Sequence, residues 1–197
     1  MYNLREKNVI CQPLYMQRKK FLSTTLAAFP LLAFAQLKIE QRDNDKPFVV
    51  KAGKSRDGSS MKYRNKHPND VIISKKDTGG NLSVFLFTGY DTVGPSLHVH
   101  FNQDEIFYVL EGNYRFVVGS ETMELEAGDT IFLPRNIPHS WIQLTPQGRL
   151  LYAAQPAGTL EDFFREMNDL AKPPTHEESQ QIHLKHGMKI MGPALKL

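Results

Sequence analysis

Short runs in which apolar and polar positions alternate follow one another between residues 71 and 156. A period of two is the pattern of a half-buried strand, and the glycine-containing stretches between the runs are typical of tight turns. Many short strands at intervals of about 8–12 residues favour an antiparallel sandwich or barrel, so the pattern predicts an all-β fold. The expected strands are Val71–Ser74, Leu82–Thr88, Ser96–Phe101, Glu105–Leu110, Tyr114–Val118, Thr122–Leu125, Thr130–Leu133, His139–Leu144 and Leu150–Ala154.

The period changes after this region, and residues 157–197 predict two helices. Thr159 precedes a segment whose apolar residues recur at helical spacing. Thr175 and Glu178 fit a capping box at the start of a second helix, and Gly187 suits the left-handed position at its end. We therefore expect a C-terminal helical extension that packs on one end or face of the barrel.

The first 35 residues have the pattern of an export signal. A basic stretch precedes a 15-residue, mostly apolar run, Phe21–Ala35, whose Ala-Phe-Ala ending is of the kind that signal peptidase cleaves. The run is short for a transmembrane helix, so we expect cleavage near Ala35–Gln36, a periplasmic or secreted protein and no permanent membrane anchor. Met16 stands where such a signal normally begins, which makes residues 1–15 consistent with a start-site artefact; the Sec and Tat routes both stay open.

The charge of the chain is concentrated in this leader. Five of the 24 basic residues but only one of the 21 acidic residues lie within residues 1–35, so the net charge of +3 does not belong to the remainder. The remainder offers no charge argument for binding nucleic acid. The single cysteine, Cys11, is also in the leader, which excludes disulfides and zinc–thiolate sites from the mature chain. Residues 36–70 are polar, and we expect an irregular arm with one short strand at residues 48–50.

Four side chains within this β region form a candidate metal site. His98 and His100 are two residues apart on an expected strand, so they point to the same face about 6.6 Å apart. Glu105 follows His100 at an odd step, and residues 101–104 must bend to bring it back to that face. His139 begins another expected strand. Three imidazoles and one carboxylate suit a single divalent transition metal such as Fe, Mn, Co, Ni, Cu or Zn, although an isolated His-x-His pair is also found on ordinary surfaces.

The spacing of the whole set resembles the two motifs of the cupin family. The first motif appears as Gly94, His98, His100, Glu105 and Gly112, and the second as Gly128, Pro134 and His139. Asn136 stands where glycine is usual and Gln143 where asparagine is usual; asparagine is able to keep a left-handed turn. The resemblance implies a single jelly-roll barrel over residues 71–156, with the three histidines and the glutamate as metal ligands.

A looser resemblance extends over most of the mature chain. Residues 77–80, 104–112, 134–139 and the C-terminal segments are similar to single-domain, quercetin-dioxygenase-like cupins of type 2. This resemblance implies a metal-dependent dioxygenase that combines O₂ with a small flavonol- or catechol-like substrate. Glu105 would be a ligand or, released from the metal, the catalytic base. Two other functions stay open: a metal-assisted isomerase or lyase acting on a sugar or keto acid, and a non-catalytic module that binds a small molecule.

Further residues near the site have two interpretations each. Phe107 and Trp141 lie two residues from Glu105 and His139, so they share the ligand-bearing face and are either core or the wall of a substrate pocket. His183, on the expected last helix, is predicted to be solvated rather than a ligand. The sequence leaves open whether the protein forms a homodimer.

Overall fold

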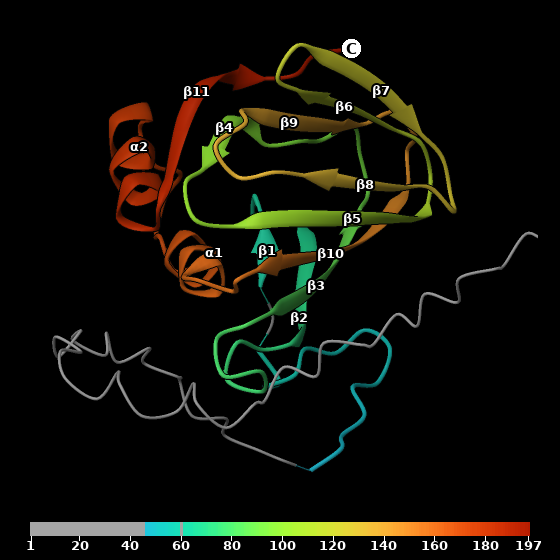
Figure 1. Ribbon diagram of the computed structural model, residues 1–197, viewed down its shortest axis with the longest axis vertical. Coiled ribbons are helices and arrows are strands. Elements are labelled where there is room, and N and C mark those ends of the chain that lie inside the picture. The colour runs from blue at the N-terminus through green and yellow to red at the C-terminus, as the bar shows by residue number, and fades with distance from the viewer. Residues whose placement is uncertain (1–45, 60) are drawn as a thin grey trace, which may run out of the picture. The chain divides into compact units, whose positions relative to one another are not determined.

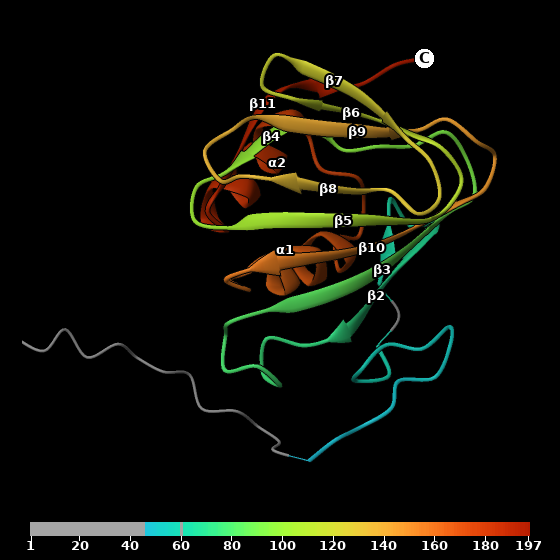
Figure 2. The ribbon, with the colours of Figure 1, turned by 45° about the vertical axis from the view of Figure 1, so that its right-hand side comes forward.

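The computed structural model describes residues 46–59 and 61–197 of the chain. The export signal expected over residues 1–35 lies outside them. In the described part, a six-stranded antiparallel sheet with the order β1-β2-β3-β10-β5-β8 is paired with a five-stranded antiparallel sheet with the order β11-β4-β9-β6-β7. The two sheets face each other and form the two sides of one barrel, which Figures 1 and 2 show from two directions. The fold is an all-β jelly roll.

From β3 onward the chain crosses repeatedly between the two sheets. The elements are β1 (Lys62–Tyr63), β2 (His67–Ile73), β3 (Ser83–Gly89), β4 (Ser96–His100), β5 (Asp104–Glu111), β6 (Tyr114–Val118), β7 (Glu121–Leu125), β8 (Thr130–Leu133), β9 (His139–Gln143), β10 (Gly148–Gln155), α1 (Leu160–Asn168), α2 (His176–Lys185) and β11 (Met188–Ala194).

All nine strands expected from the alternation are confirmed, and their inward positions form the core between the sheets. In β3 the residues alternate between buried and half-buried along the whole strand, and Phe85 and Phe87 point inward. Tyr152 on β10 stacks between Phe85 and Phe107 of the flanking strands, at ring-centroid distances of 4.8 and 5.0 Å. Such stacked aromatic neighbours fix the register of three adjacent strands as well as burying apolar area.

The arm differs from its prediction. Residues 48–50 form no strand, whereas β1 forms at Lys62–Tyr63, and β2, which contains the strand expected from Val71, begins earlier, at His67, and pairs with β3 in the six-stranded sheet. The sequence His-Pro-Asn-Asp at the start of β2 is polar and contains proline, so it lacks the local pattern of a strand. These residues form a strand because they pair with β1 and with β3, which follows after a turn.

The C-terminal extension was predicted to be helical, but its last segment is a strand. The helices α1 and α2 are both present, and the capping box of Thr175 and Glu178 forms at α2. The chain then leaves α2 through Gly187, at φ +73°, into β11, which pairs with β4 in the five-stranded sheet. Figure 1 shows α2 beside β11, with α1 next to it at one side of the barrel. In the described part of the chain, neither helix has the length and hydrophobicity needed to cross a membrane.

Candidate metal centre

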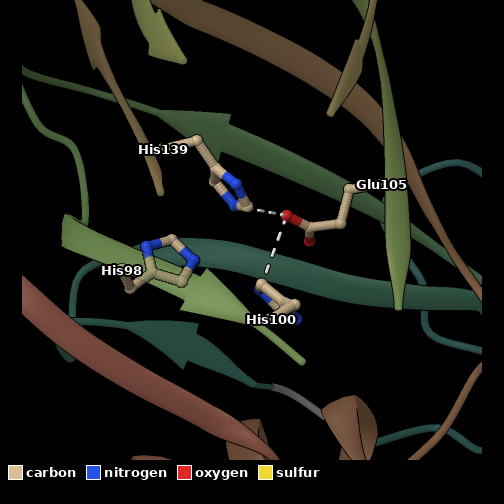
Figure 3. A group of neighbouring side chains, drawn as sticks. All are labelled: His98, His100, Glu105 and His139. Atoms are coloured by element: carbon tan, nitrogen blue, oxygen red, sulfur yellow. Dashed lines mark hydrogen bonds and ion pairs between the residues drawn. The ribbon is translucent and has the colours of Figure 1, made fainter. Parts of the chain in front are cut away.

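The four side chains of the predicted metal site converge between the two sheets (Figure 3). His98 and His100 lie on β4, and His98 is directly opposite His139 on the neighbouring strand β9. Glu105 comes from β5 in the other sheet, so it faces the histidines from across the barrel. The turn at residues 101–103 carries the chain from one sheet to the other, which explains how an odd step in sequence ends at the same point in space.

The second histidine strand is positioned by the turn that precedes it. Asn136 adopts φ +64°, the left-handed conformation that the sequence predicted for the residue replacing glycine. Its backbone N–H donates to the carbonyl oxygen of His100 at 2.8 Å. This bond ties the turn before β9 to the end of β4, and so fixes His139 relative to His100.

The candidate ligand atoms lie within 4.8 Å of one another. Oε2 of Glu105 is 3.1 Å from Nε2 of His139 and 3.5 Å from Nε2 of His100. His100, Glu105 and His139 expose only 1%, 4% and 1% of their surface, respectively, so these groups are largely withdrawn from water.

Backbone carbonyls set the orientation of two of the imidazoles. Nδ1 of His98 lies 2.8 Å from the carbonyl oxygen of Ser96, and Nδ1 of His139 lies 3.0 Å from that of Ile137. A carbonyl oxygen only accepts, so each Nδ1 carries the proton and donates it. In the neutral form of each ring, Nε2 is then the nitrogen with a free lone pair, which a metal ligand needs.

A glutamine side chain does the same for the third imidazole. Nδ1 of His100 lies 3.3 Å from Oε1 of Gln103, whose Nε2 donates to the carbonyl oxygen of Ala157 at 2.6 Å. Gly158 makes room for this bond, because a Cβ there would lie 2.7 Å from Nε2 of Gln103. The sequence analysis did not single out Gln103, since a polar residue in a turn has no distinguishing local pattern.

The carboxylate of Glu105 and the facing imidazoles favour a cation in this cluster. Burial raises the pKa of Glu105, but the facing imidazoles outweigh it and lower the pKa to about 2, so the carboxyl is ionised at neutral pH. Burial is also the main cause that lowers the pKa values of His98 and His100, which favours neutral rings. Oε2 of Glu105 lies 3.1 Å from Nε2 of His139, where either a proton on that nitrogen or a metal ion keeps the two acceptor atoms from repelling each other. The donor set therefore fits a divalent transition metal.

The four ligands stand at the floor of a cavity of about 480 Å³. Its size lies within the range of small-molecule sites, roughly 300–1,000 Å³. Phe107 and Trp141 line it, as the pocket interpretation of these residues predicted, and both also pack in the core. Phe87 meets the indole ring of Trp141 edge-on at 5.1 Å, and Tyr152 adds a further aromatic wall. In a small barrel one set of rings therefore serves both the core and the pocket.

The helices close part of this cavity and contribute a histidine that was expected in solvent. His183 on α2 lines the cavity, with its ring 4.7 Å from that of Phe163 and 6.5 Å from that of His98. Its Nδ1 donates to the carbonyl oxygen of Ser179 at 2.6 Å, and burial lowers its pKa. His183 was predicted to be solvated, but it is half-buried, because α2 packs one side against α1 and β11 while its other residues stay exposed.

Comparison with known proteins agrees with this geometry. Residues 90–151 match a family model described as a cupin domain. An uncharacterized protein of Methanocaldococcus jannaschii is 33% identical over 97 residues, which are 49% of this chain and 68% of the relative. The chain belongs to the cupin superfamily.

Two further similarities are more distant. The quercetin 2,3-dioxygenase of Bacillus subtilis is 25% identical over 130 residues, which are 66% of this cupin but only 37% of the dioxygenase. An RmlC-like cupin from Shewanella frigidimarina superposes with a TM-score of 0.46 and 20% identity, over 58% of this chain and 96% of that one.

Proposed function

We propose that this cupin is a metal-dependent dioxygenase acting on a small, oxygen-rich substrate of the flavonol or catechol type. One observation carries the proposal: three imidazoles and a carboxylate converge at the floor of an aromatic-lined cavity large enough for such a molecule. A purely structural metal site is closed by its ligands, whereas a catalytic site opens onto the space where substrate binds.

His98, His100 and His139 would hold the metal through Nε2, and Glu105 through a carboxylate oxygen. The ion would supply Lewis acidity toward a substrate oxygen and, for a redox-active metal, electron transfer to O₂. Fe, Mn, Co, Ni, Cu and Zn all accept this mixed nitrogen and oxygen donor set.

Glu105 has the properties of the base in such a reaction. Its carboxyl is ionised and largely buried, and it lines the same cavity as the aromatic walls. It would accept the proton of a substrate hydroxyl placed over the floor, which makes the substrate more electron-rich.

The walls would orient the substrate and exclude water. Phe107 and Trp141 present apolar surface on opposite sheets, and a planar ring system stacks well on such side chains. The Tyr152 hydroxyl donates to Oδ1 of Asn69 at 2.8 Å, and both residues line the cavity. This buried pair leaves the amide nitrogen of Asn69 as a donor on the same wall.

One relative, the quercetin 2,3-dioxygenase of Bacillus subtilis, supports dioxygen chemistry, although this chain matches only 37% of that protein. We therefore propose dioxygen chemistry on a planar, oxygen-bearing substrate, and the substrate itself has to be found by experiment.

Oxygen consumption tests the proposal directly. The protein, purified without chelators or a metal-affinity tag, is analysed for bound metals and then incubated with flavonols and catechols in an oxygen electrode. Metal-dependent O₂ uptake that matches substrate loss supports the dioxygenase. A substrate isomerised or cleaved without O₂ would favour the isomerase or lyase, and unchanged substrate recovered after binding would favour the non-catalytic module.

Glu105→Gln separates catalysis from metal binding. The amide keeps a coordinating oxygen but does not accept a proton near neutral pH, so turnover should fall steeply while three imidazoles retain most of the metal. Glu111→Gln, an exposed change at the other end of the same strand β5, is the matched control and should leave both unchanged. A Glu105→Gln variant with full metal and wild-type rate would remove Glu105 as the base.

A further inference from the structure

The charges that line the cavity are distributed unevenly between floor and mouth. Among the described residues that line it, Glu105 is the single acid, and it lies at the floor with the imidazoles. Three cations, Lys62, Arg64 and Lys172, line the cavity and are themselves exposed, which places them at its mouth. We call these three residues the mouth cations.

No ion pair is found for the mouth cations, whereas seven of the other lysines and arginines in the described part of the chain have an acidic partner. Seven other lysines and arginines of the described chain form ion pairs within 4 Å: Arg56, Lys66, Lys75, Arg115, Arg135, Arg165 and Lys185. None of the ion pairs found in residues 46–59 and 61–197 includes a mouth cation. Asp169, close in sequence to Lys172, is exposed and does not line the cavity.

The backbone holds Arg64 in a left-handed conformation at this position. Arg64 and Asn65 have φ values of +51° and +58°, in the left-handed region that residues other than glycine seldom adopt. The two residues lie in the tight turn between β1 and β2, where such left-handed residues are ordinary. The guanidinium lies 5.4 Å from the ring of Tyr63, whose hydroxyl donates to the carbonyl oxygen of Gly94 at 3.0 Å. The arginine is thus positioned on an anchored ring.

The other two mouth cations are also attached to fixed elements. The backbone N–H of Lys62 donates to Oδ1 of Asn168 at 3.0 Å, which ties β1 to the end of α1. Lys172 directly precedes Pro173 and Pro174 in the connection between α1 and α2, where the proline rings restrict the backbone. Cations that are held in place lose less entropy when they bind an anion than freely moving ones.

We propose that the cavity selects a substrate with an anionic group at one end, a carboxylate or a phosphate monoester, bound by the mouth cations. The apolar body of the substrate lies between the aromatic walls, and its oxygen-bearing end reaches the floor. The inference rests on the proposed function only in taking this cavity as the substrate site; it requires neither a particular metal nor turnover.

The chain contains its own reporter for a binding experiment. Trp141 is the single tryptophan of the sequence, and it lines the cavity. Its fluorescence is followed during titration with 3-phenylpropionate, with the uncharged analogue 3-phenylpropionamide, and with 2-phenylethyl phosphate. The three probes share a phenyl body and differ in the charged end, so a difference in dissociation constant reports on the anion.

We expect the carboxylate to bind about tenfold more tightly than the amide, the scale of several solvent-screened ion pairs together. The preference should weaken as salt is raised. Titration with 2-phenylethyl phosphate distinguishes the two anions. A lower dissociation constant than that of the carboxylate indicates a phosphate ester, and a higher one indicates a carboxylate.

Variants assign the preference to the mouth. Lys62→Gln/Arg64→Gln/Lys172→Gln should bring the two dissociation constants to within about twofold, leaving that of the amide unchanged. The control Lys51→Gln/Lys54→Gln/Lys189→Gln removes the same charge from exposed residues outside the cavity and should keep the preference.

A repeat after metal removal separates the mouth from the floor. Without metal the floor offers no bound cation to an anion, so the preference must persist if the mouth cations cause it. Equal affinities for carboxylate and amide, or no detectable binding of either anion, would overturn the inference even if metal-dependent O₂ uptake is found. Anion preference without any O₂ uptake would keep the inference and remove the dioxygenase.

Discussion

Replacing Gln103 by leucine should weaken metal binding although Gln103 is not a ligand. The change removes the acceptor for Nδ1–H of His100 and the donor to the carbonyl oxygen of Ala157, at 3.3 and 2.6 Å. His100 is then free to rotate or to adopt the other tautomer, in which Nε2 carries the proton and its lone pair is lost to the metal.

The size of the effect follows from the loss of a partner to a metal-binding histidine, which typically costs about 10–100-fold in metal affinity. That corresponds to about 1.4–2.8 kcal/mol of binding free energy. The carbonyl left without a donor beside a buried side chain should also lower the free energy of unfolding of the metal-free protein by about 1–3 kcal/mol. The two effects are measured separately.

Gln143→Leu is the matched control for this experiment. Gln143 is also fully buried, and it accepts from the Tyr114 hydroxyl at 3.3 Å and donates to the carbonyl oxygen of Thr145 at 2.8 Å. It does not line the cavity, so its loss should reduce stability by a similar amount and leave metal affinity unchanged.

Competition between the protein and a chromophoric chelator for Zn²⁺ or Co²⁺ gives the metal affinity, and denaturant unfolding of the metal-free protein gives stability. Wild-type metal affinity in Gln103→Leu would refute the role assigned to this side chain. An equal loss of affinity in both variants would show that it reflects general destabilisation rather than the orientation of His100.

Three further predictions concern other parts of the chain. His98→Ala should lower metal stoichiometry, measured by elemental analysis, far more than His183→Ala, because His183 lines the cavity outside the ligand cluster; equal content would misplace the site. Partial burial raises the pKa of Asp57, but hydrogen bonds, including one from Arg165, lower it to about 2 from 3.8, so the ion pair stabilises the fold above about pH 4 and less as pH falls toward 2. Asp57→Asn should therefore cost less than about 1 kcal/mol at pH 7, with the difference from wild type shrinking in acid unfolding experiments; a difference that grows in acid contradicts this. N-terminal sequencing of protein from its native host should begin near Gln36, and recovery only of the uncleaved chain would contradict export.

The strands and the ligand cluster were predictable because their signals are local. In β3 and β10 every second residue is buried, so the alternation of apolar residues reports the fold directly. The His-x-His pair needs only strand geometry to face one way. The position of Glu105 needed one further step, since its odd spacing required a turn, and the structure shows that this turn changes sheets.

The features that could not be predicted depend on contacts between distant segments. β11 contains Gly192 and Pro193 and pairs with β4, some ninety residues earlier, so nothing in its own sequence identifies a strand. Gln103 orients His100 only because Ala157 comes back to meet it. His183 is half-buried only because α2 packs beside the barrel. A single sequence shows which residues are capable of such contacts but not which of them meet.

The candidate metal ligands and the mouth cations come from different parts of the chain, and this limits what family membership implies. The matched family region, residues 90–151, contains all four candidate ligands together with Phe107 and Trp141. The mouth cations and the helical walls come from residues 61–65 and 160–183, outside that region. Strands in fixed register hold metal ligands in a precise arrangement. The sequence of a hairpin and two helices at the rim is able to vary without disturbing those ligands. The cupin match therefore bears on the metal site, whereas the proposed substrate preference depends on the mouth cations.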